Sequence, residues 1–122
     1  VGAAVSVDDA ARLYRQRDAL REAPERVLER TPILALPTTA IPPPALTSEL
    51  VHGGAELLML RALGAFTPLA NLTDLPSIAV PCGVDDRGRP LSIMFVAGRG
   101  GEATLLQIAT AVEATGLATT AV

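Results

Sequence analysis

Two prolines enclose a four-residue apolar run in the stretch ANLTDLPSIAVPCG, residues 70–83. Proline restricts the residue before it to extended backbone and has no N–H to donate to a neighbouring strand. The run at residues 77–80 is therefore predicted to be a strand that begins after Pro76 and ends at Pro81. The residues that follow are expected to lead the chain away from the sheet.

The rest of the chain alternates between helical and extended patterns. The predicted elements are a helix over residues 7–30, a strand and proline-rich loop over 33–46, a helix over 48–63, strands within 77–97 and a helix over 102–115. Pro24 is expected to kink the first helix or to open a second one. The run ILAL, residues 33–36, has the pattern of a strand buried on both faces, and the strand that ends at Ala97 is a candidate hairpin partner of the run at 77–80. This order predicts an α/β fold of one domain, residues 1–122, built as a layered sandwich with a small mixed sheet.

Composition excludes several classes of partner. The net charge is −3 and the arginines are scattered, so the chain has no basic stripe with which to bind nucleic acid. The longest uncharged run, residues 31–48, contains five prolines, which argues against a membrane-spanning helix and predicts no membrane partner. The single cysteine cannot form a disulfide within the chain and is typical of a reducing compartment such as the cytoplasm.

The apolar residues are numerous but small. The hydrophobic fraction is 49%, whereas the aromatic fraction is 2%. The core must therefore be built from Ala, Leu, Val and Ile, which lack the large contact area of aromatic rings. The sequence thus predicts more apolar surface than its own core needs.

Cys82 and Asn71 are the residues of the opening stretch with side chains suited to chemistry. Cys82 is a candidate nucleophile with His52, the one histidine of the sequence, as its base. The alternative is a buried structural cysteine. Asn71 begins the triplet Asn-Leu-Thr, a glycosylation acceptor pattern that is common by chance. The alternative is a turn asparagine whose side chain bonds to nearby backbone.

Two further segments raise similar alternatives. GRGGE, residues 98–102, precedes a helix, where glycines can hold a phosphate. However, Glu102 would repel an anion and no P-loop lysine is present, so a flexible strand-to-helix turn is favoured. Asp85 and Asp86 are candidate metal ligands, but no further ligands stand at a recognisable spacing, so a solvated turn is favoured. The sequence predicts no cofactor and no metal.

Three blocks of the sequence, in order, resemble the carboxyl-terminal third of the amidase signature family. The first is a charged helix that runs into ILALPTTAIPPP. The second, FTPLANLTDLPSIAVPCG at residues 66–83, is similar to the family's T-x-P-x-N-x-x-G-L-P-A-x-S-V-P-C-G run and is the most specific. The third, GRPLSIMFVAGRGGEATLL at residues 88–106, resembles the family's G-L-P-V-G-L-Q-L-V-G followed by E-A-T-L-L. Among the departures, Asp74 stands where the family has Gly before Leu-Pro.

The resemblance implies a hydrolase of carboxamide C–N bonds that works through a Ser, a cis-Ser and a Lys. In the family these residues lie in the part of the fold that precedes the matched region, and this sequence contains no lysine. The chain is therefore expected to carry no catalytic residue and to be inactive alone. It is expected to be the carboxyl-terminal portion of such an enzyme, where it completes the sheet and walls one side of the acyl pocket.

By the same resemblance, Phe66, Thr67 and Asn71 lie nearest that pocket. A Thr and an Asn on a loop can orient an amide, and a Phe can line an apolar site. A turn-fixing role for Asn71 stays open. The expected partners are a small-molecule amide, bound only together with a catalytic lobe, and either a second copy or a partner chain that covers unpaired strand edges.

A different class of function also stays open, a stand-alone binding or assembly module that kept the amidase-like fold and lost the chemistry. The upstream coding sequence would separate the two, because an in-frame lysine and a Gly-Ser-Ser-Gly-like segment would indicate the enzyme. A third alternative is a cysteine enzyme that uses Cys82, which unchanged activity of a Cys82→Ala variant would exclude.

Overall fold

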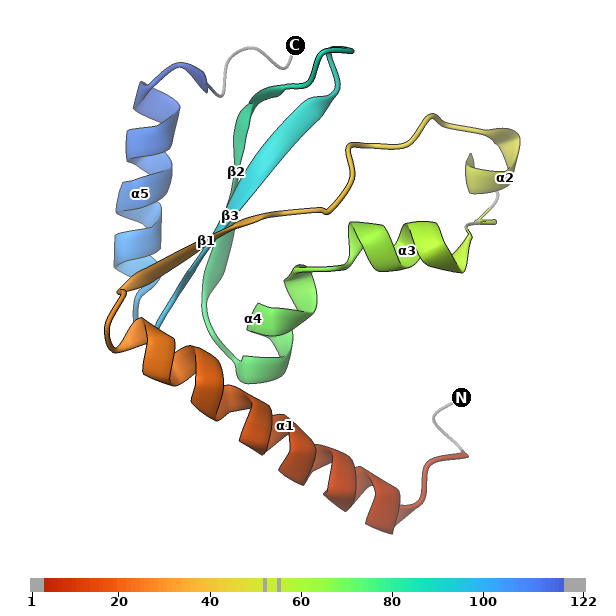
Figure 1. The fold of residues 1–122 in the computed structure, drawn as a ribbon, viewed down its shortest axis with the longest axis vertical. Coiled ribbons are helices and arrows are strands. Elements are labelled where there is room, and N and C mark those ends of the chain that lie inside the picture. The colour runs from red at the N-terminus through yellow and green to blue at the C-terminus, as the bar shows by residue number, and fades with distance from the viewer. Residues whose placement is uncertain (1–3, 52, 55, 118–122) are drawn as a thin grey trace.

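The structure, a computed structural model, describes residues 4–51, 53–54 and 56–117. Its elements, in chain order, are α1 (Val7–Leu28), β1 (Ile33–Pro37), α2 (Ser48–Val51), α3 (Leu57–Leu63), α4 (Thr67–Thr73), β2 (Ser77–Val84), β3 (Pro90–Ala97) and α5 (Glu102–Ala114). Helices flank a small sheet, and α2 and α3 project away from it (Figure 1). The expected α/β class is confirmed.

The sheet has three strands in the order β1-β3-β2. β2 and β3 form the expected hairpin, and β1 pairs with the other side of β3. Both pairings are antiparallel, so the expectation of a mixed sheet is wrong for the described strands. Because β3 is central, β1 and β2 are both edge strands.

β2 continues past the proline that was expected to end it. Pro81 pairs with Ser92, and the register then shifts before Gly83 pairs with Leu91. An edge strand tolerates proline, since its missing N–H can point away from the ladder. Cys82 lies at the register shift, which is the position of a β-bulge. The prediction that the strand ends at Pro81 is therefore wrong, because the sequence does not show that β2 lies at an edge of the sheet, where a proline is tolerated.

The two faces of the sheet are covered by different helices. α5 packs against β2 and β3 on one face, and α4 with the end of α1 lies on the other (Figure 1). The buried cluster on the α4 side joins the helix to the sheet through Ala70, Leu75, Met94 and Val96. On the α5 side, Leu105 and Ala109 are buried. The core is thus small and aliphatic, as the composition predicts.

α1 begins after Ser6, which is its N-cap residue. The backbone N–H of Asp9 donates to Ser6 Oγ at 3.1 Å, and Ser6 Oγ donates to Asp9 Oδ2 at 2.7 Å. The helix then runs without interruption through Pro24 to Leu28. Of the two alternatives for Pro24, a kink or the start of a second helix, the second is therefore not seen in this described segment. Proline here removes the hydrogen bond to the carbonyl of Leu20 within an otherwise continuous helix.

The segment predicted as one helix over residues 48–63 forms two short helices instead. Gly53 has φ of +84°, a left-handed conformation that an α-helix cannot contain. α3 then ends at Gly64, whose N–H donates to Leu60 O at 3.0 Å. His52, the candidate base for Cys82, lies outside the described residues.

β1 is less buried than its sequence predicts. Ala35 and Pro37 are exposed, whereas Leu34 and Leu36 are half-buried and pack against the core cluster. The expectation of burial on both faces is wrong, because α5 contacts mainly β2 and β3. In the described part of the chain, no helix is long and apolar enough to cross a bilayer.

Candidate functional site

The residues expected to lie at an acyl pocket are on α4, a two-turn helix with Pro68 in its first turn. Proline suits this position because the first N–H groups of a helix have no acceptor in the helix. Phe66 is the N-cap residue, and its ring packs against the core cluster together with Leu34 and Leu36. Phe66 thus fixes where α4 begins on the sheet.

Thr67 and Asn71 stand four residues apart and therefore share one flank of α4. Thr67 is half-buried and Asn71 is exposed. Leu72 lies about 100° around the helix from Asn71 and lines a groove with residues of α1. Among the described residues, no hydrogen bond involves the Asn71 side chain, so the turn-fixing role is not what the structure shows.

Thr73 and Asp74 close the end of α4 instead. Thr73 is buried, and its Oγ donates to Leu69 O at 2.6 Å. Asp74 has φ of +54° and ψ of +36°, the left-handed conformation that favours Gly. The chain then enters β2 through Leu75. This left-handed backbone explains why the family pattern has Gly at this position. In this chain Asp74 adopts the same conformation although it carries a side chain.

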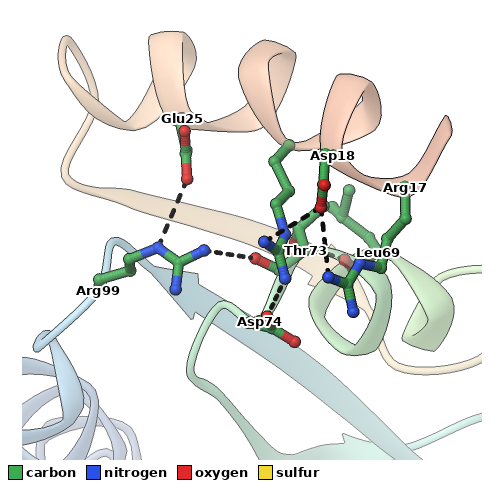
Figure 2. A network of polar contacts seen from close by, with 8 residues as sticks. Arg17, Asp18, Glu25, Leu69, Thr73, Asp74 and Arg99 are labelled. Carbon is green, nitrogen blue, oxygen red and sulfur yellow. Dashed lines mark hydrogen bonds and ion pairs between the residues drawn. The ribbon is translucent and has the colours of Figure 1, made fainter. Parts of the chain in front are cut away.

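That side chain is part of a polar cluster between α1 and α4 (Figure 2). Arg21 of α1 donates to Asp74 Oδ2, and it also approaches Asp18 Oδ1 at 3.4 Å. Arg17 donates to the same Asp18 oxygen at 3.2 Å. Because Asp74 is about half exposed, solvent screens its ion pair. The contact fixes the relative position of the two helices.

Arg99 reaches the same region from the segment that follows β3 (Figure 2). Its Nε lies 3.5 Å from Glu25 Oε1, and its terminal nitrogen donates to Thr73 O at 3.4 Å. A guanidinium at a helix C-terminus satisfies a free carbonyl and opposes the negative end of the helix dipole. The turn after β3 is therefore tied to both α1 and α4.

An apolar groove of about 490 Å³ lies along α1. Its apolar lining includes Leu13, Tyr14 and Leu20 of α1 together with Leu72 of α4. The Arg17 guanidinium stacks over the Tyr14 ring at 5.1 Å from its centroid. Phe66, Thr67 and Asn71 do not line this groove. Part of the apolar surface of α1 therefore stays open.

A second hollow of about 390 Å³ lies where β1 runs into the proline-rich loop. Cys82, Leu91 and Ile93 line one side, and Ile41 and Pro42 line the other. Cys82 is half-buried and unpaired. Cys82 therefore has a structural role at the β-bulge of β2. A catalytic dyad of Cys82 with His52 stays a prediction.

The two adjacent acids form the hairpin turn that the sequence favours. Asp85 Oδ1 accepts from the backbone N–H of Arg87 at 3.0 Å and of Arg89 at 2.8 Å, and Oδ2 accepts from Arg89 Nε at 2.7 Å. Two hydrogen bonds from Arg89 hold the pKa of the Asp85 carboxyl below its ordinary value. The larger effect comes from the backbone N–H and the next from the side chain. Across the described residues, no group of three or more His, Cys, Asp or Glu side chains is placed to hold a metal ion.

The glycines before α5 meet a steric requirement. Gly101 is the N-cap residue, and a Cβ built there would lie 2.6 Å from the Cβ of Ala97. Gly100 has φ of +79°. Close approach and left-handed backbone explain both glycines as parts of the favoured strand-to-helix turn.

Comparison with known protein families identifies the family to which this chain belongs. The sequence model of the family described as Amidase matches residues 4–106, which include every described element from α1 to the first turns of α5. The chain belongs to the amidase family. The resemblance of residues 66–83 and 88–106 to the family's patterns is thereby confirmed.

Individual relatives are proteins much longer than this chain. A fatty acid amide hydrolase of Oryza sativa subsp. indica is 35% identical over 86 residues, which cover 70% of this chain and 14% of the relative. A glutamyl-tRNA(Gln) amidotransferase subunit of Syntrophus aciditrophicus (strain SB) is 38% identical over 89 residues, which cover 73% of this chain and 18% of the relative. The chain therefore spans less than a fifth of each.

A solved structure shares the fold. The structure of 6-aminohexanoate cyclic dimer hydrolase complexed with substrate superposes with a TM-score of 0.78 and 26% sequence identity. The superposition covers 92% of this chain and 25% of that one. The sheet and its helices are therefore arranged as in one part of an amidase-family enzyme.

Proposed function

We propose that this chain forms part of an amidase-family hydrolase that acts on carboxamide C–N bonds, and that it supplies sheet and pocket wall rather than catalytic groups. The match of one amidase family model to residues 4–106 is the observation that carries the proposal. The solved neighbour supports it, because 92% of this chain corresponds to only 25% of a longer amidase-family chain.

The chemistry supports a non-catalytic role for these residues. The amidase resemblance implies a nucleophile that exchanges its proton through a lysine, and the sequence contains no lysine. The oxyanion formed during amide hydrolysis also needs donors aimed at it. By the resemblance, those donors belong to another part of the enzyme. The 122-residue chain alone is therefore proposed to be inactive.

The exposed flank of α4 is the part proposed to face the acyl pocket. Asn71 offers both an amide donor and an amide acceptor, and its side chain is not engaged by the described residues. Thr67 adds a hydroxyl on the same flank. Phe66 would contribute indirectly, because its contact with the core cluster holds the start of α4 on the sheet. The substrate proposed is a small-molecule amide that binds only when a catalytic lobe closes the other side.

A cytoplasmic location belongs to the same proposal. Its support is the single cysteine, which lies half-buried and unpaired in β2.

The test compares the chain alone with the chain beside a catalytic lobe. The purified 122-residue chain is incubated with acetamide, benzamide and a long-chain acyl amide, and the release of ammonia is followed. No release above a buffer blank is expected. Release that follows the chain through two unrelated purification routes would contradict the proposal.

A second arm tests the pocket wall. In an active complex with a catalytic lobe, Asn71→Ala is expected to raise KM about tenfold, because a substrate hydrogen bond is lost. Asn71→Asp is a size-matched control that keeps an acceptor and removes the donor. An unchanged KM in Asn71→Ala would remove Asn71 from the site.

A further inference from the structure

α4, the helix proposed to face the acyl pocket, is too short to hold its own direction. It has seven residues, and its N-cap residue Phe66 has no side-chain group that could cap the first turn. An isolated helix of two turns is unstable in water, so its position depends on tertiary contacts. Phe66 packs against the core cluster at its start, and Ala70 is buried in its middle. The contacts at its other end therefore decide how the flank with Thr67 and Asn71 is presented.

Two arginines from different elements hold that other end. Arg21 of α1 donates to the carboxylate of Asp74, the C-cap residue of α4. Arg99, in the turn after β3, donates to the backbone carbonyl of Thr73 at 3.4 Å (Figure 2). One guanidinium thus binds the helix end through a side chain and the other through the backbone of the preceding residue. Each also pairs with a carboxylate of α1, so the end of α4 is tied to that helix.

The contact with Arg21 depends on a residue in which this chain departs from the family pattern. Asp74 stands where the pattern has Gly, which has no side chain for Arg21 to bind. Arg21 is well placed to direct the carboxylate, because its side chain is only 20% exposed, against 58% for Arg12 in the surface pair with Asp9. A sheltered guanidinium between Asp18 and Asp74 has few other orientations available. It therefore fixes the position of the Asp74 side chain.

This contact is close to Asn71 along the helix. Asn71 precedes Asp74 by three residues, which is a little less than one turn. Among the described helices and strands, α1 is the element with which α4 makes its main contact. If the tie to α1 is released, fraying or rotation of the last turn is expected to move the Asn71 side chain first.

We propose that Arg21 is a positioning residue for the substrate pocket. By pairing with Asp74, while Arg99 holds the neighbouring carbonyl, it keeps the last turn of α4 in place so that Asn71 faces the amide substrate. The inference rests on the proposed function, and it adds a residue that acts on the pocket wall without touching the substrate.

The first measurement is amide hydrogen exchange in the full 122-residue chain, followed by NMR. The N–H of Asp74 donates to Ala70 O and therefore reports on the last turn of α4. Arg21→Gln is expected to speed its exchange at least about fivefold, whereas Arg21→Lys, which keeps the charge, is expected to stay within about twofold of wild type. Arg12→Gln is the matched control and is expected to behave like wild type, because its ion pair with Asp9 does not involve α4.

The second measurement is steady-state amide hydrolysis by the active complex with a catalytic lobe. Arg21→Gln is expected to raise KM about fivefold and to leave kcat within about twofold, because it weakens a binding contact and leaves the reacting groups in place. Asp74→Asn, which removes the charge from a residue type that tolerates left-handed backbone, is expected to have the same effect.

Two further variants show whether Arg21 acts through these residues. In an Asp74→Asn or an Asn71→Ala background, Arg21→Gln is expected to raise KM no further, because the interaction that it disturbs is already lost. Leu105→Ala weakens the packing of α5 on the opposite face of the sheet and is expected to leave KM unchanged. This comparison separates positioning of Asn71 from a general loss of stability.

Two results would overturn the inference. They are unchanged exchange of the Asp74 N–H in Arg21→Gln, and a KM that rises in Asn71→Ala but not in Arg21→Gln. If Arg21→Gln does not fold, Asp74→Asn makes both comparisons. The proposed function is read separately, because a complex without amide hydrolysis, or a KM that ignores Asn71→Ala, refutes the function or its pocket wall. Fast exchange in Arg21→Gln with recovery in Arg21→Lys would then still show that Arg21 holds α4.

Discussion

At the scale of single residues, Asp74 combines an unfavourable backbone with a favourable contact. Its φ of +54° is a conformation that Gly adopts freely, while its carboxylate pairs with Arg21. Asp74→Gly is expected to leave the free energy of unfolding within about 0.5 kcal/mol of wild type, because relief of strain offsets a screened ion pair. Asp74→Ala keeps the strain and loses the pair, so it is expected to be about 1–2 kcal/mol less stable.

Urea denaturation followed by circular dichroism measures both variants. The informative quantity is the difference in the free energy of unfolding between Asp74→Gly and Asp74→Ala, since both substitutions remove the carboxylate. Equal destabilisation by the two would show that the ion pair dominates and that the left-handed backbone costs little here.

Asp85 gives the chain a pH-dependent turn. Its folded pKa lies below the ordinary value, mainly because of hydrogen bonds from Arg89. The stabilising contribution is therefore present above the unfolded pKa of about 3.9 and is lost as the pH falls toward the folded pKa. Asp85→Asn is expected to be less stable than wild type at about pH 7, with a gap that shrinks as the pH drops below about 4.

Thermal melts at a series of pH values check this prediction. Asp86→Asn is the matched control, because the neighbouring acid is exposed and makes no such set of hydrogen bonds among the described residues. A gap for Asp85→Asn that stays constant from about pH 7 to about pH 3 would contradict the assignment of the effect to ionisation.

The role of a residue could be predicted from the sequence where its partner lies nearby in the chain, and not where the partner is distant. The Ser6–Asp9 cap was predictable because its partners are three residues apart. The contact of Arg21 with Asp74 spans 53 residues, so only the folded chain brings the two together. Asn71 illustrates the converse, since its local pattern allowed a contact with nearby backbone, whereas the α4 side chain that makes such a contact is Thr73, which donates to Leu69 O.

At the scale of elements, α5 holds one face of the sheet through few side chains. Leu105 is 3% exposed, while its neighbour Leu106 points to solvent. Leu105→Ala is expected to lower the free energy of unfolding by about 2–4 kcal/mol, through lost apolar contact and a residual cavity. Leu106→Ala is expected to change it by less than about 0.5 kcal/mol. Urea denaturation of the pair provides the measurement, and similar losses in both would mean that α5 is not docked as described.

The elements that the sequence predicted well had strong local signals at both ends. The hairpin of β2 and β3 has a turn that Asp85 organises, and α5 starts at a glycine turn and ends near Gly116. α4 was missed because it has only seven residues, begins at a Thr-Pro pair and lies inside a stretch dominated by proline signals. The break between α2 and α3 was not predicted, although it includes Gly53, which has a left-handed backbone conformation.

At the scale of the whole molecule, the sequence predicted apolar surplus but not where it would lie. Composition alone indicated more apolar surface than one core needs. The structure places much of that surplus on α1 and α3, whereas α5 packs on β2 and β3. Which edge is most open depends on the strand order, and strand order is a property of the folded chain rather than of any local pattern.

The two edges differ in how well they resist pairing with another molecule. β2 carries Pro81 and a β-bulge, both of which disrupt the regular row of donors and acceptors that a new strand would need. β1 has its proline only at its last position, Pro37, and Ala35 leaves its middle exposed. β1 is therefore the edge at which free chains are expected to associate.

A lysine on that edge should prevent the association. The wild-type sedimentation coefficient is expected to rise with concentration, whereas Ala35→Lys is expected to stay at the monomer value, because an added strand would bury the charge. Ala111→Lys makes the same change on an exposed position of α5 and is expected to behave like wild type. Sedimentation velocity over a wide concentration range, on the order of 1–100 μM, resolves the three. Equal behaviour of the two lysine variants would attribute the effect to net charge, and a wild-type chain that stays monomeric throughout would show that the β1 edge is protected after all.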